Sequence, residues 1–254
     1  MTGKVVVVTG GTRGIGAGLV KEFLERGCRV ATCGRSAVEV PGALSIVADV
    51  TDEPGMQKLW DETVAEYGRV DVWINNAGIS APRAPFASLD LETARRVVDV
   101  NLLGVMTGSS VALRGFLGQG SGQLWNMEGF GSGGQKAPGM AVYGASKRAV
   151  TYFTQALLKD TKGTPVQVGL LSPGIVLTDL LTGDYDGDPE GFAKAQKIFN
   201  ILGDRVETVT PWLAEQVLIT DKTGAHVQWL TKRKAFARFA TSFRKRDLFV
   251  RSST

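Results

Sequence analysis

The chain has 254 residues, of which 43% are hydrophobic and 21% charged, and it carries two cysteines, Cys28 and Cys33. These values are ordinary for a globular protein, and they exclude a mainly disordered, collagen-like or fibrous chain. There is no run of about 18 apolar residues, no secretory leader pattern, and no cysteine or histidine spacing typical of disulfide frameworks or metal sites. We therefore expect no membrane-spanning helix, no metal, and a reducing, cytoplasm-like compartment.

The basic charge of the chain is concentrated at its C-terminus. There are 29 Lys and Arg against 25 Asp and Glu, but residues 226–254 hold eight of the basic residues and only one of the acidic ones. The remainder is slightly acidic. Nucleic-acid binding requires a basic surface spread over a folded face, so we expect no nucleic-acid partner.

Short β-branched runs alternate with amphipathic helical segments along the chain. Strands are predicted at residues 5–9, 29–33, 44–47, 70–74, 122–127, 166–171 and 224–230. Helices are predicted at residues 15–26, 56–67, 91–117 and 143–158. This alternation predicts an α/β fold with a doubly wound, Rossmann-type parallel sheet. We expect one domain over residues 1–231, with a lid at 178–202, followed by a basic extension at 232–254.

A glycine-rich string links the first predicted strand directly to the first predicted helix. Glycines allow a tight turn and let a pyrophosphate approach the N-terminus of the helix. A glycine-rich turn without a ligand is the alternative, but the strand–turn–helix context favours a dinucleotide. The residues expected to bind it here are Gly10, Thr12, Arg13, Gly14, Ile15 and Gly16.

The end of the second predicted strand indicates which dinucleotide binds. An acidic residue there would accept hydrogen bonds from a ribose diol and repel a 2′-phosphate. This chain instead has Arg35 and Ser36, and Arg13 lies in the glycine-rich turn. Arginine suits bidentate phosphate binding, so we predict NADPH as the cofactor. Solvated surface charge is the alternative explanation for both arginines.

Three motifs together carry a family resemblance. They are the Gly-xxx-Gly-x-Gly string, Asn75-Asn76-Ala77-Gly78, and Tyr143-xxx-Lys147. Over roughly residues 3–231 the chain resembles the short-chain dehydrogenase/reductase family. The resemblance implies a helix-bending role for Asn101, and cofactor contacts from Asp49, Val50, Asn76, Ala77, Gly78, Tyr143, Lys147, Pro173, Gly174 and Thr178.

Tyr143 and Lys147 are four residues apart on one predicted helix and therefore share a face. A phenol is a weak acid at neutral pH, and a neighbouring ammonium lowers its pKa. We expect Tyr143 to protonate the alkoxide formed by hydride addition, and Lys147 to hold the nicotinamide ribose. A surface Tyr–Lys pair is the alternative.

The family's catalytic serine, about thirteen residues before the tyrosine, is missing. Phe130 occupies that position, and Glu128-Gly129 replaces the usual serine pair. Ser132, or backbone N–H groups around Gly129, would be substitutes for polarising the carbonyl. A Glu128 carboxylate would oppose a developing alkoxide, so it acts only if protonated or in contact with another part of the substrate. A loop hydrogen bond is the equally weighted alternative for Glu128.

Residues 126–134 read Asn-Met-Glu-Gly-Phe-Gly-Ser-Gly-Gly, and this string resembles the chlorophyll(ide) b reductases. The similarity continues through residues 171–181 and 197–202. It implies NADPH-dependent reduction of the C7 formyl group of chlorophyll b or chlorophyllide b to hydroxymethyl. The alternatives are a reductase of another apolar aldehyde or ketone, and a non-catalytic NADPH-binding module. A plastid location would follow only for a plant protein whose transit peptide is missing from the sequence.

The sequences of the lid and the tail suggest which substrate and which surface the protein contacts. Apolar lid residues would line a flat pocket for a tetrapyrrole pigment, with ordinary lid packing as the alternative. Residues 232–250 are predicted to form a basic amphipathic helix, which either contacts a membrane peripherally or docks its phenylalanines on the protein itself or on a neighbouring subunit. The family resemblance implies a homo-oligomer. His226, the only histidine, is expected to be a packed core or edge residue.

Overall fold

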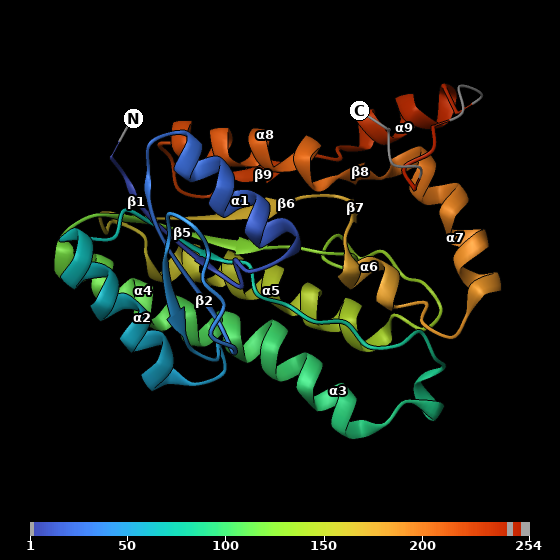
Figure 1. The fold of residues 1–254 in the computed structure, drawn as a ribbon, viewed down its shortest axis with the longest axis horizontal. Helices are drawn as coiled ribbons and strands as arrows, with labels where there is room; N and C mark the ends of the chain where they lie inside the picture. Colours follow the sequence, from blue (N-terminus) through green and yellow to red (C-terminus); the bar gives the residue numbers. More distant parts are fainter. Residues whose placement is uncertain (1–2, 243–245, 250–254) are drawn as a thin grey trace.

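The computed structural model describes residues 3–242 and 246–249. At its centre lies a sheet of seven parallel strands in the order β3-β2-β1-β4-β5-β6-β9 (Figure 1). The strands are β1 (Val5–Thr9), β2 (Arg29–Gly34), β3 (Leu44–Val47), β4 (Val72–Asn75), β5 (Gly122–Met127), β6 (Val166–Ser172) and β9 (His226–Gln228). The doubly wound, Rossmann-type fold that the alternating pattern predicts is therefore confirmed.

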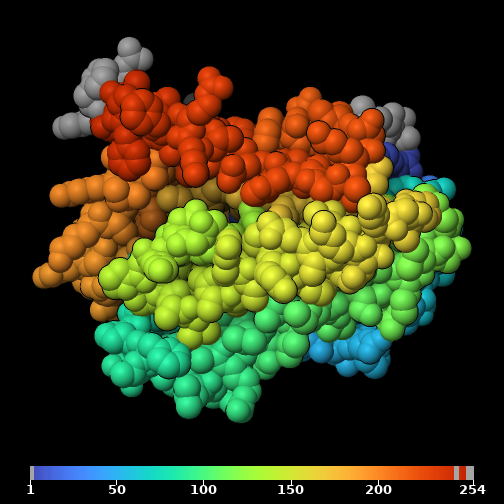
Figure 2. Space-filling model, turned by 180° about the vertical axis from the view of Figure 1, so that it is seen from behind, coloured from blue at the N-terminus to red at the C-terminus, as the bar shows by residue number. Residues whose placement is uncertain are grey.

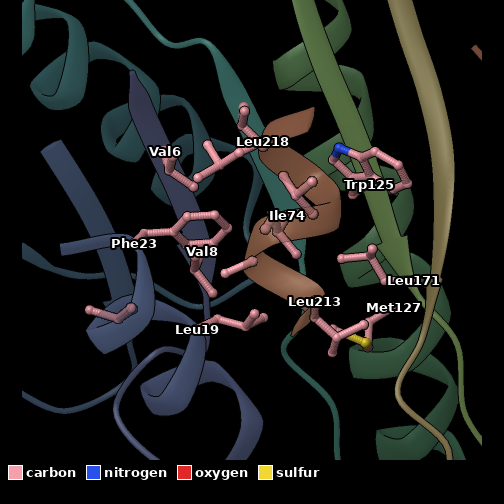
Figure 3. Packing of buried hydrophobic residues seen from close by; sticks show 14 of the residues in the cluster. Val6, Val8, Leu19, Phe23, Ile74, Trp125, Met127, Leu171, Leu213 and Leu218 are labelled. Carbon is pink, nitrogen blue, oxygen red and sulfur yellow. The ribbon is translucent and has the colours of Figure 1, made fainter. Parts of the chain in front are cut away.

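Helices cover both faces of the sheet (Figure 1). One face carries α1 (Gly14–Glu25) and α8 (Val206–Ile219), and the other carries α2 (Glu53–Tyr67), α4 (Gly104–Gln119) and α5 (Ala141–Asp160). Successive side chains of a strand point to opposite faces, so Val6 and Val8 of β1 join the first core cluster and Val7 joins the second. Figure 3 shows Val6 and Val8 packed with residues of α1 and α8.

The order of the strands places a crevice at the carboxyl ends of β1 and β4. From β1 the chain winds outward through β2 and β3, and then restarts at β4 on the other side of β1. Ligands of open parallel sheets bind at such a reversal. The side chain of Thr9, the last residue of β1, accepts hydrogen bonds from the backbone N–H groups of Asn76 (3.0 Å) and Ala77 (3.1 Å), which fixes the loop after β4 against β1.

The helical stretch predicted at residues 91–117 is divided in the structure. α3 (Leu91–Val98) and α4 are joined by a π-helical turn at Asp99–Leu103, which contains the buried Asn101. Single π-turns of this kind occur often at functional sites. By length and composition the continuous stretch Leu91–Gln119 would suffice to cross a membrane, which is weak evidence because core helices pass the same test. Here Val111 and Phe116 of this stretch are fully covered by the core.

The sequence pattern misses several elements after β6. These are α6 (Asp179–Gly183), α7 (Pro189–Leu202) and α8, together with a small sheet of β7 (Val176–Leu177) and β8 (Asp204–Arg205). α6 and α7 form the segment expected to be the lid. α8 carries Pro211 in its interior and begins with β-branched residues, so its sequence lacks a clear helical pattern.

The helix predicted at residues 232–250 is shorter in the structure. α9 spans Lys232–Ala240 and lies beside α7 (Figures 1 and 2). Residues 241–242 and 246–249 are not helical, and residues 243–245 and 250 of the predicted helix lie outside the described residues. Leu248 is buried and donates its N–H to the side chain of Asn200 on α7 (2.9 Å), while the ring of Phe249 contacts Phe192. The prediction of one continuous helix is wrong because this returning segment packs on α7.

Candidate active site

A cavity of about 690 Å³ opens at the carboxyl edge of the sheet. Every residue expected from the sequence to bind the cofactor lines it. These residues are Gly10, Thr12, Arg13, Gly14, Ile15, Gly16, Arg35, Ser36, Asp49, Val50, Asn76, Ala77, Gly78, Tyr143, Lys147, Pro173, Gly174 and Thr178. Glu128 also lines the cavity, whereas Asn101 and Ser132 do not.

The glycine-rich turn has the shape needed to hold a phosphate group. Gly10 and Gly14 have φ values of 69° and 55°, which L-residues with side chains rarely adopt. A Cβ on Gly16 would lie 2.2 Å from the carbonyl oxygen of Gly10, so only glycine fits there. Arg13 precedes α1 without capping it through its side chain, and the first turn holds no acidic residue. The amide groups of this turn are therefore available to an anion.

Arg13 and Arg35 both line the cavity, and both are exposed. Neither has an acidic partner within 4.0 Å in the part of the chain that the structure describes. Two unpaired guanidinium groups favour a phosphate group at this end of the cavity.

Asn101 does not line the cavity but holds two segments that do. Its side chain donates to the carbonyl oxygen of Ile79 (2.8 Å) and accepts from the N–H of Ile79 (2.8 Å), and it also donates to the hydroxyl of Ser146 on α5 (3.2 Å). The side chain therefore fixes the loop after β4 to the helix that carries Tyr143 and Lys147. This is a positioning role, not a contact with the cavity.

Tyr143 and Lys147 lie on α5 as expected, and the ammonium group of Lys147 is 6.0 Å from the centre of the Tyr143 ring. The Lys147 ammonium donates to the carbonyl oxygen of Met127 (3.2 Å). Burial lowers the pKa of Lys147 to about 8, against a raising effect of Glu128. The expected lowering of the tyrosine pKa by Lys147 is wrong for this structure, because burial and then Asp184 raise the pKa of Tyr143.

The two substitutes considered for the missing serine are both engaged elsewhere. The hydroxyl of Ser132 is buried, accepts from the N–H of Gly129 (3.2 Å) and donates to the carbonyl oxygen of Lys147 (3.2 Å). The prediction for Ser132 is therefore wrong, since its hydroxyl is directed at Lys147 and does not line the cavity, and the N–H of Gly129 is engaged by Ser132. Polarisation by the other backbone N–H groups around Gly129 stays a prediction. A Cβ at Gly129 would lie 2.5 Å from the Tyr143 hydroxyl, so the loop passes directly beside that hydroxyl.

Of the two alternatives for Glu128, the structure shows the loop hydrogen bond. Its carboxylate is buried, accepts from Thr151 on α5 (2.8 Å) and lies 2.7 Å from Nε2 of His226 on β9. Burial opposes ionisation, but the hydrogen bonds of His226 and Thr151 outweigh it and lower the pKa of Glu128. The same contact raises the pKa of His226. His226 is thus an edge residue, as expected, but its imidazole pairs with a carboxylate.

Sequence reasoning did not identify three polar residues of the cavity: Ser80, Arg83 and Asp184. The first two lie in the loop after β4, and Asp184 directly follows α6. Burial raises the pKa of Asp184 to about 6, against lowering effects of Ser80 and Arg83. The position of Ser80, two residues after the Asn75–Gly78 motif, could have identified it as a cavity residue. No feature of the sequence distinguishes Asp184 from the other acidic residues of the lid.

Comparisons with known proteins agree with this geometry. The family model described as short chain dehydrogenase matches residues 4–188. The chain is 30% identical over 270 residues to the probable chlorophyll(ide) b reductase NYC1 of Arabidopsis thaliana (95% of this chain, 53% of that protein). It is 33% identical over 268 residues to the chlorophyll(ide) b reductase NOL of the same plant (94% and 75%). The chain thus spans about half the length of the NYC1 relative.

Two further comparisons extend the range of relatives. The chain is 37% identical over 186 residues to the L-fucose dehydrogenase of Bos taurus (70% of this chain, 68% of that protein). The solved structure of a short chain dehydrogenase from Burkholderia cenocepacia J2315 in complex with NADP has a TM-score of 0.75 and 27% identity, covering 89% of this chain and 97% of that one. On its sequence, fold and site geometry, this chain belongs to the short-chain dehydrogenase family of oxidoreductases.

Proposed function

We propose that the protein reduces the C7 formyl group of chlorophyll b or chlorophyllide b to hydroxymethyl, with NADPH as the reductant. The family and the relatives named as reductases support NAD(P)-dependent carbonyl reduction. The observation that carries the choice of substrate is the apolar mouth of the cavity. Phe130, Leu180 and Ile198 line it, and they remain 37%, 39% and 43% exposed. Exposed apolar side chains at a binding cavity fit a flat, apolar ligand.

The cavity fits a nicotinamide dinucleotide phosphate. The turn at Gly10–Gly16 and the uncapped N-terminus of α1 would bind the pyrophosphate, and Arg13 and Arg35 would bind the 2′-phosphate. Asp49 and Val50 would contact the adenine, and Pro173, Gly174 and Thr178 would contact the nicotinamide near Tyr143. Asn76, Ala77 and Gly78 would contact the cofactor between them, and all of these residues line the cavity.

When bound, the cofactor supplies a hydride to the formyl carbon, and the electron pair of the C=O π bond passes to the oxygen. Tyr143 gives its phenolic proton to that oxygen, which completes the hydroxymethyl group. Burial keeps Tyr143 protonated, as a proton donor requires. Lys147, with a pKa near 8, carries a positive charge at neutral pH and holds the ribose side of the site.

The size of the cavity limits how a pigment is bound. About 690 Å³ lies in the range for one drug-sized ligand of roughly 300–1,000 Å³, and it has to hold the cofactor as well. Only the edge of the macrocycle that bears the formyl group enters while α6 and α7 keep their positions. The rest of the ring would lie against Phe130, Leu180 and Ile198.

The tail provides the second proposed contact, with an anionic membrane surface. Phe236 and Phe239 on α9 are 76% and 47% exposed, so the chain's own fold does not cover them. Docking on a neighbouring subunit stays the alternative to a membrane. Lys232 and Arg233 are also exposed on the same helix. Exposed aromatic and basic side chains on one helix favour binding to anionic lipid, where a lipid-dissolved pigment would be reached.

The test is incubation of the protein with chlorophyllide b and NADPH, with NADH in parallel, read by the absorption bands of the pigment. We expect conversion to the hydroxymethyl product with NADPH, and much slower conversion with NADH. Reduction of a simple aryl aldehyde without any conversion of chlorophyllide b would reject the pigment and retain a reductase of another apolar aldehyde or ketone. NADPH binding without reduction of either would favour the non-catalytic module.

A further inference from the structure

Three donors from the last part of the chain meet at the carboxylate of Asp204, two residues after the end of α7. The Arg238 guanidinium contacts both carboxylate oxygens (2.8 and 3.0 Å), Arg246 contacts one of them (2.9 Å), and the indole N–H of Trp229 donates to the other (2.6 Å). Burial opposes ionisation, but the hydrogen bonds of Arg238, Trp229 and Arg246 outweigh it and lower the pKa of Asp204. The side chain of Asp204 is only 3% exposed, so the charged carboxylate is shielded from water and held by these donors.

The same two arginines cap the end of α7. Arg238 also donates to the carbonyl oxygen of Leu202 (2.8 Å), and Arg246 donates to those of Ile201 (3.3 Å) and Gly203 (3.1 Å). The last carbonyl groups of a helix have no partner within the helix, and cations are favourable there. The end of α7 is thus held by side chains from residues 232–242 and 246–249, which we call the strap, and α9 of the strap lies beside α7 (Figure 1).

The end of the strap also reaches the aromatic side chains of the lid. The centre of the Phe249 ring lies 5.5 Å from that of Phe192, which lies 5.6 Å from that of Tyr185. Tyr185 lines the cavity, whereas none of the described strap residues does. The strap therefore acts on the cavity only through the lid.

Asp204 joins the lid to another segment that lines the cavity. Its N–H donates to the carbonyl oxygen of Ile175 (2.9 Å), and it pairs with Val176 in the small sheet of β7 and β8. Ile175 and Val176 both line the cavity, and α7 itself contributes Ile198 and Phe199 to the lining. Asp204 therefore fixes the position of α7 relative to the segment after β6.

We propose that the strap sets the position of α7 and so determines how the apolar body of a large substrate binds, with Asp204, Arg238 and Arg246 as positioning residues. This inference rests on the proposed carbonyl reduction but not on the identity of the pigment. A small aldehyde needs only the groups around Tyr143, whereas the body of a large one extends to Ile198 on α7. Loss of the strap contacts should therefore weaken the binding of large aldehydes and leave NADPH binding and hydride transfer nearly unchanged.

The first experiment compares Arg246→Gln with Lys194→Gln in the absence of lipid. Lys194 is an exposed cation of α7 and has no acidic partner within 4.0 Å among the residues that the structure describes. The substrates are benzaldehyde and pyrene-1-carbaldehyde, which is a flat polycyclic aldehyde. We expect Arg246→Gln to raise the KM for pyrene-1-carbaldehyde about tenfold, with kcat and the KM for benzaldehyde within about twofold of the control. Arg246→Lys keeps the charge beside Asp204 and should recover part of the loss.

Two results would overturn the proposal. One is a KM for pyrene-1-carbaldehyde in Arg246→Gln within about twofold of the Lys194→Gln control. The other is a general loss, in which the KM for benzaldehyde rises, or the NADPH affinity falls, as much as the KM for the large aldehyde rises.

A second measurement is independent of turnover. Pyrene-1-carboxamide has the shape of the large aldehyde but is not reduced, and its binding to the protein with NADPH can be followed by pyrene fluorescence. We expect about tenfold weaker binding in Arg246→Gln than in Lys194→Gln, and equal binding in the two variants would contradict the proposal. If the wild type reduces neither aldehyde, the reductase proposal fails, while pyrene-1-carboxamide binding still decides the role of the strap.

Phe249→Ser takes the place of Arg246→Gln if that variant does not fold. It removes the ring contact with Phe192 and leaves both arginines at Asp204. We expect it to weaken pyrene-1-carboxamide binding about threefold and to leave NADPH affinity unchanged. Binding equal to that of Lys194→Gln would then reject the strap.

Discussion

Oε2 of Glu128 lies 2.7 Å from Nε2 of His226 and joins the loop after β5 to the first residue of β9. The carboxylate is almost fully buried, with a side-chain exposure of 4%, whereas the imidazole is 45% exposed. The residue that breaks the family pattern in the catalytic loop is thus tied to the last strand of the sheet.

The Glu128–His226 pair should stabilise the fold within a defined pH range. The lowered pKa of Glu128 gives a contribution that is present above its unfolded value and lost in acid. The raised pKa of His226 gives one that is complete below its unfolded value and lost as pH rises through the folded value. We expect Glu128→Gln to cost about 1–2 kcal/mol of unfolding free energy between about pH 5 and 6.5, and less outside that range.

Urea unfolding at pH 6 and pH 9 measures this effect. Glu53→Gln is the matched control, because it breaks the exposed pair of Glu53 with Arg114. The control should cost less than about 1 kcal/mol and show no such pH window. The same loss of stability in both variants would reject a special role for the buried pair.

Tyr143→Phe and Glu128→Gln should affect aldehyde reduction differently. Loss of the Tyr143 hydroxyl removes the proton donor, so the rate should fall about 10²–10⁴-fold. Glu128→Gln should keep measurable activity, because its carboxylate contacts Thr151 and His226. Steady-state rates with benzaldehyde and NADPH measure this, and equal losses in the two variants would contradict it.

Glu128→Gln should also change the pH profile. The Glu128 carboxylate raises the pKa of Lys147, which burial holds near 8. Without that negative charge the pKa of Lys147 should fall, so activity should be lost at a lower pH than in the wild type. The measurement is the pH dependence of kcat in both proteins. If activity falls at the same alkaline pH in Glu128→Gln and in the wild type, Lys147 does not control the rate.

Arg35 should determine the preference for NADPH over NADH. It is exposed at the cavity wall and has no acidic partner within 4.0 Å among the described residues. Arg35→Gln should weaken NADPH binding about tenfold or more and leave NADH binding nearly unchanged, since only NADPH carries the 2′-phosphate. Fluorescence titration measures both affinities. Lys21→Gln, on the exposed side of α1, is the control, and an effect as large in this variant would point to general charge rather than a phosphate site.

The exposed phenylalanines of α9 should bind the protein to anionic vesicles. Phe236→Ser with Phe239→Ser should reduce co-sedimentation several-fold, and removal of residues 232–254 should reduce it at least as much. Phe86→Ser, which removes an exposed phenylalanine far from α9 in the sequence, is the control. Vesicle binding that is equal in the wild type and the truncated chain would reject the membrane contact.

Most of the fold could be predicted from local sequence signals. All seven strands of the main sheet were located, because each is a short run with an apolar centre that is bounded by turn residues. α8 was missed since Pro211 and its β-branched start conceal a helix that tertiary packing enforces. The tail was predicted as one helix because amphipathic spacing does not reveal where a chain turns back to pack on α7.

The sequence by itself determined the doubly wound fold and the family, and it located the residues predicted to bind the cofactor, which are gathered in one cavity. These follow from glycine and strand–helix signals that are local, since each motif folds into its own turn or strand end. Only the tertiary structure decided what each group in the catalytic loop contacts. Glu128 pairs with a histidine 98 residues away, and the Ser132 hydroxyl is turned inward. Such contacts depend on how distant segments meet, and no spacing along the chain records them.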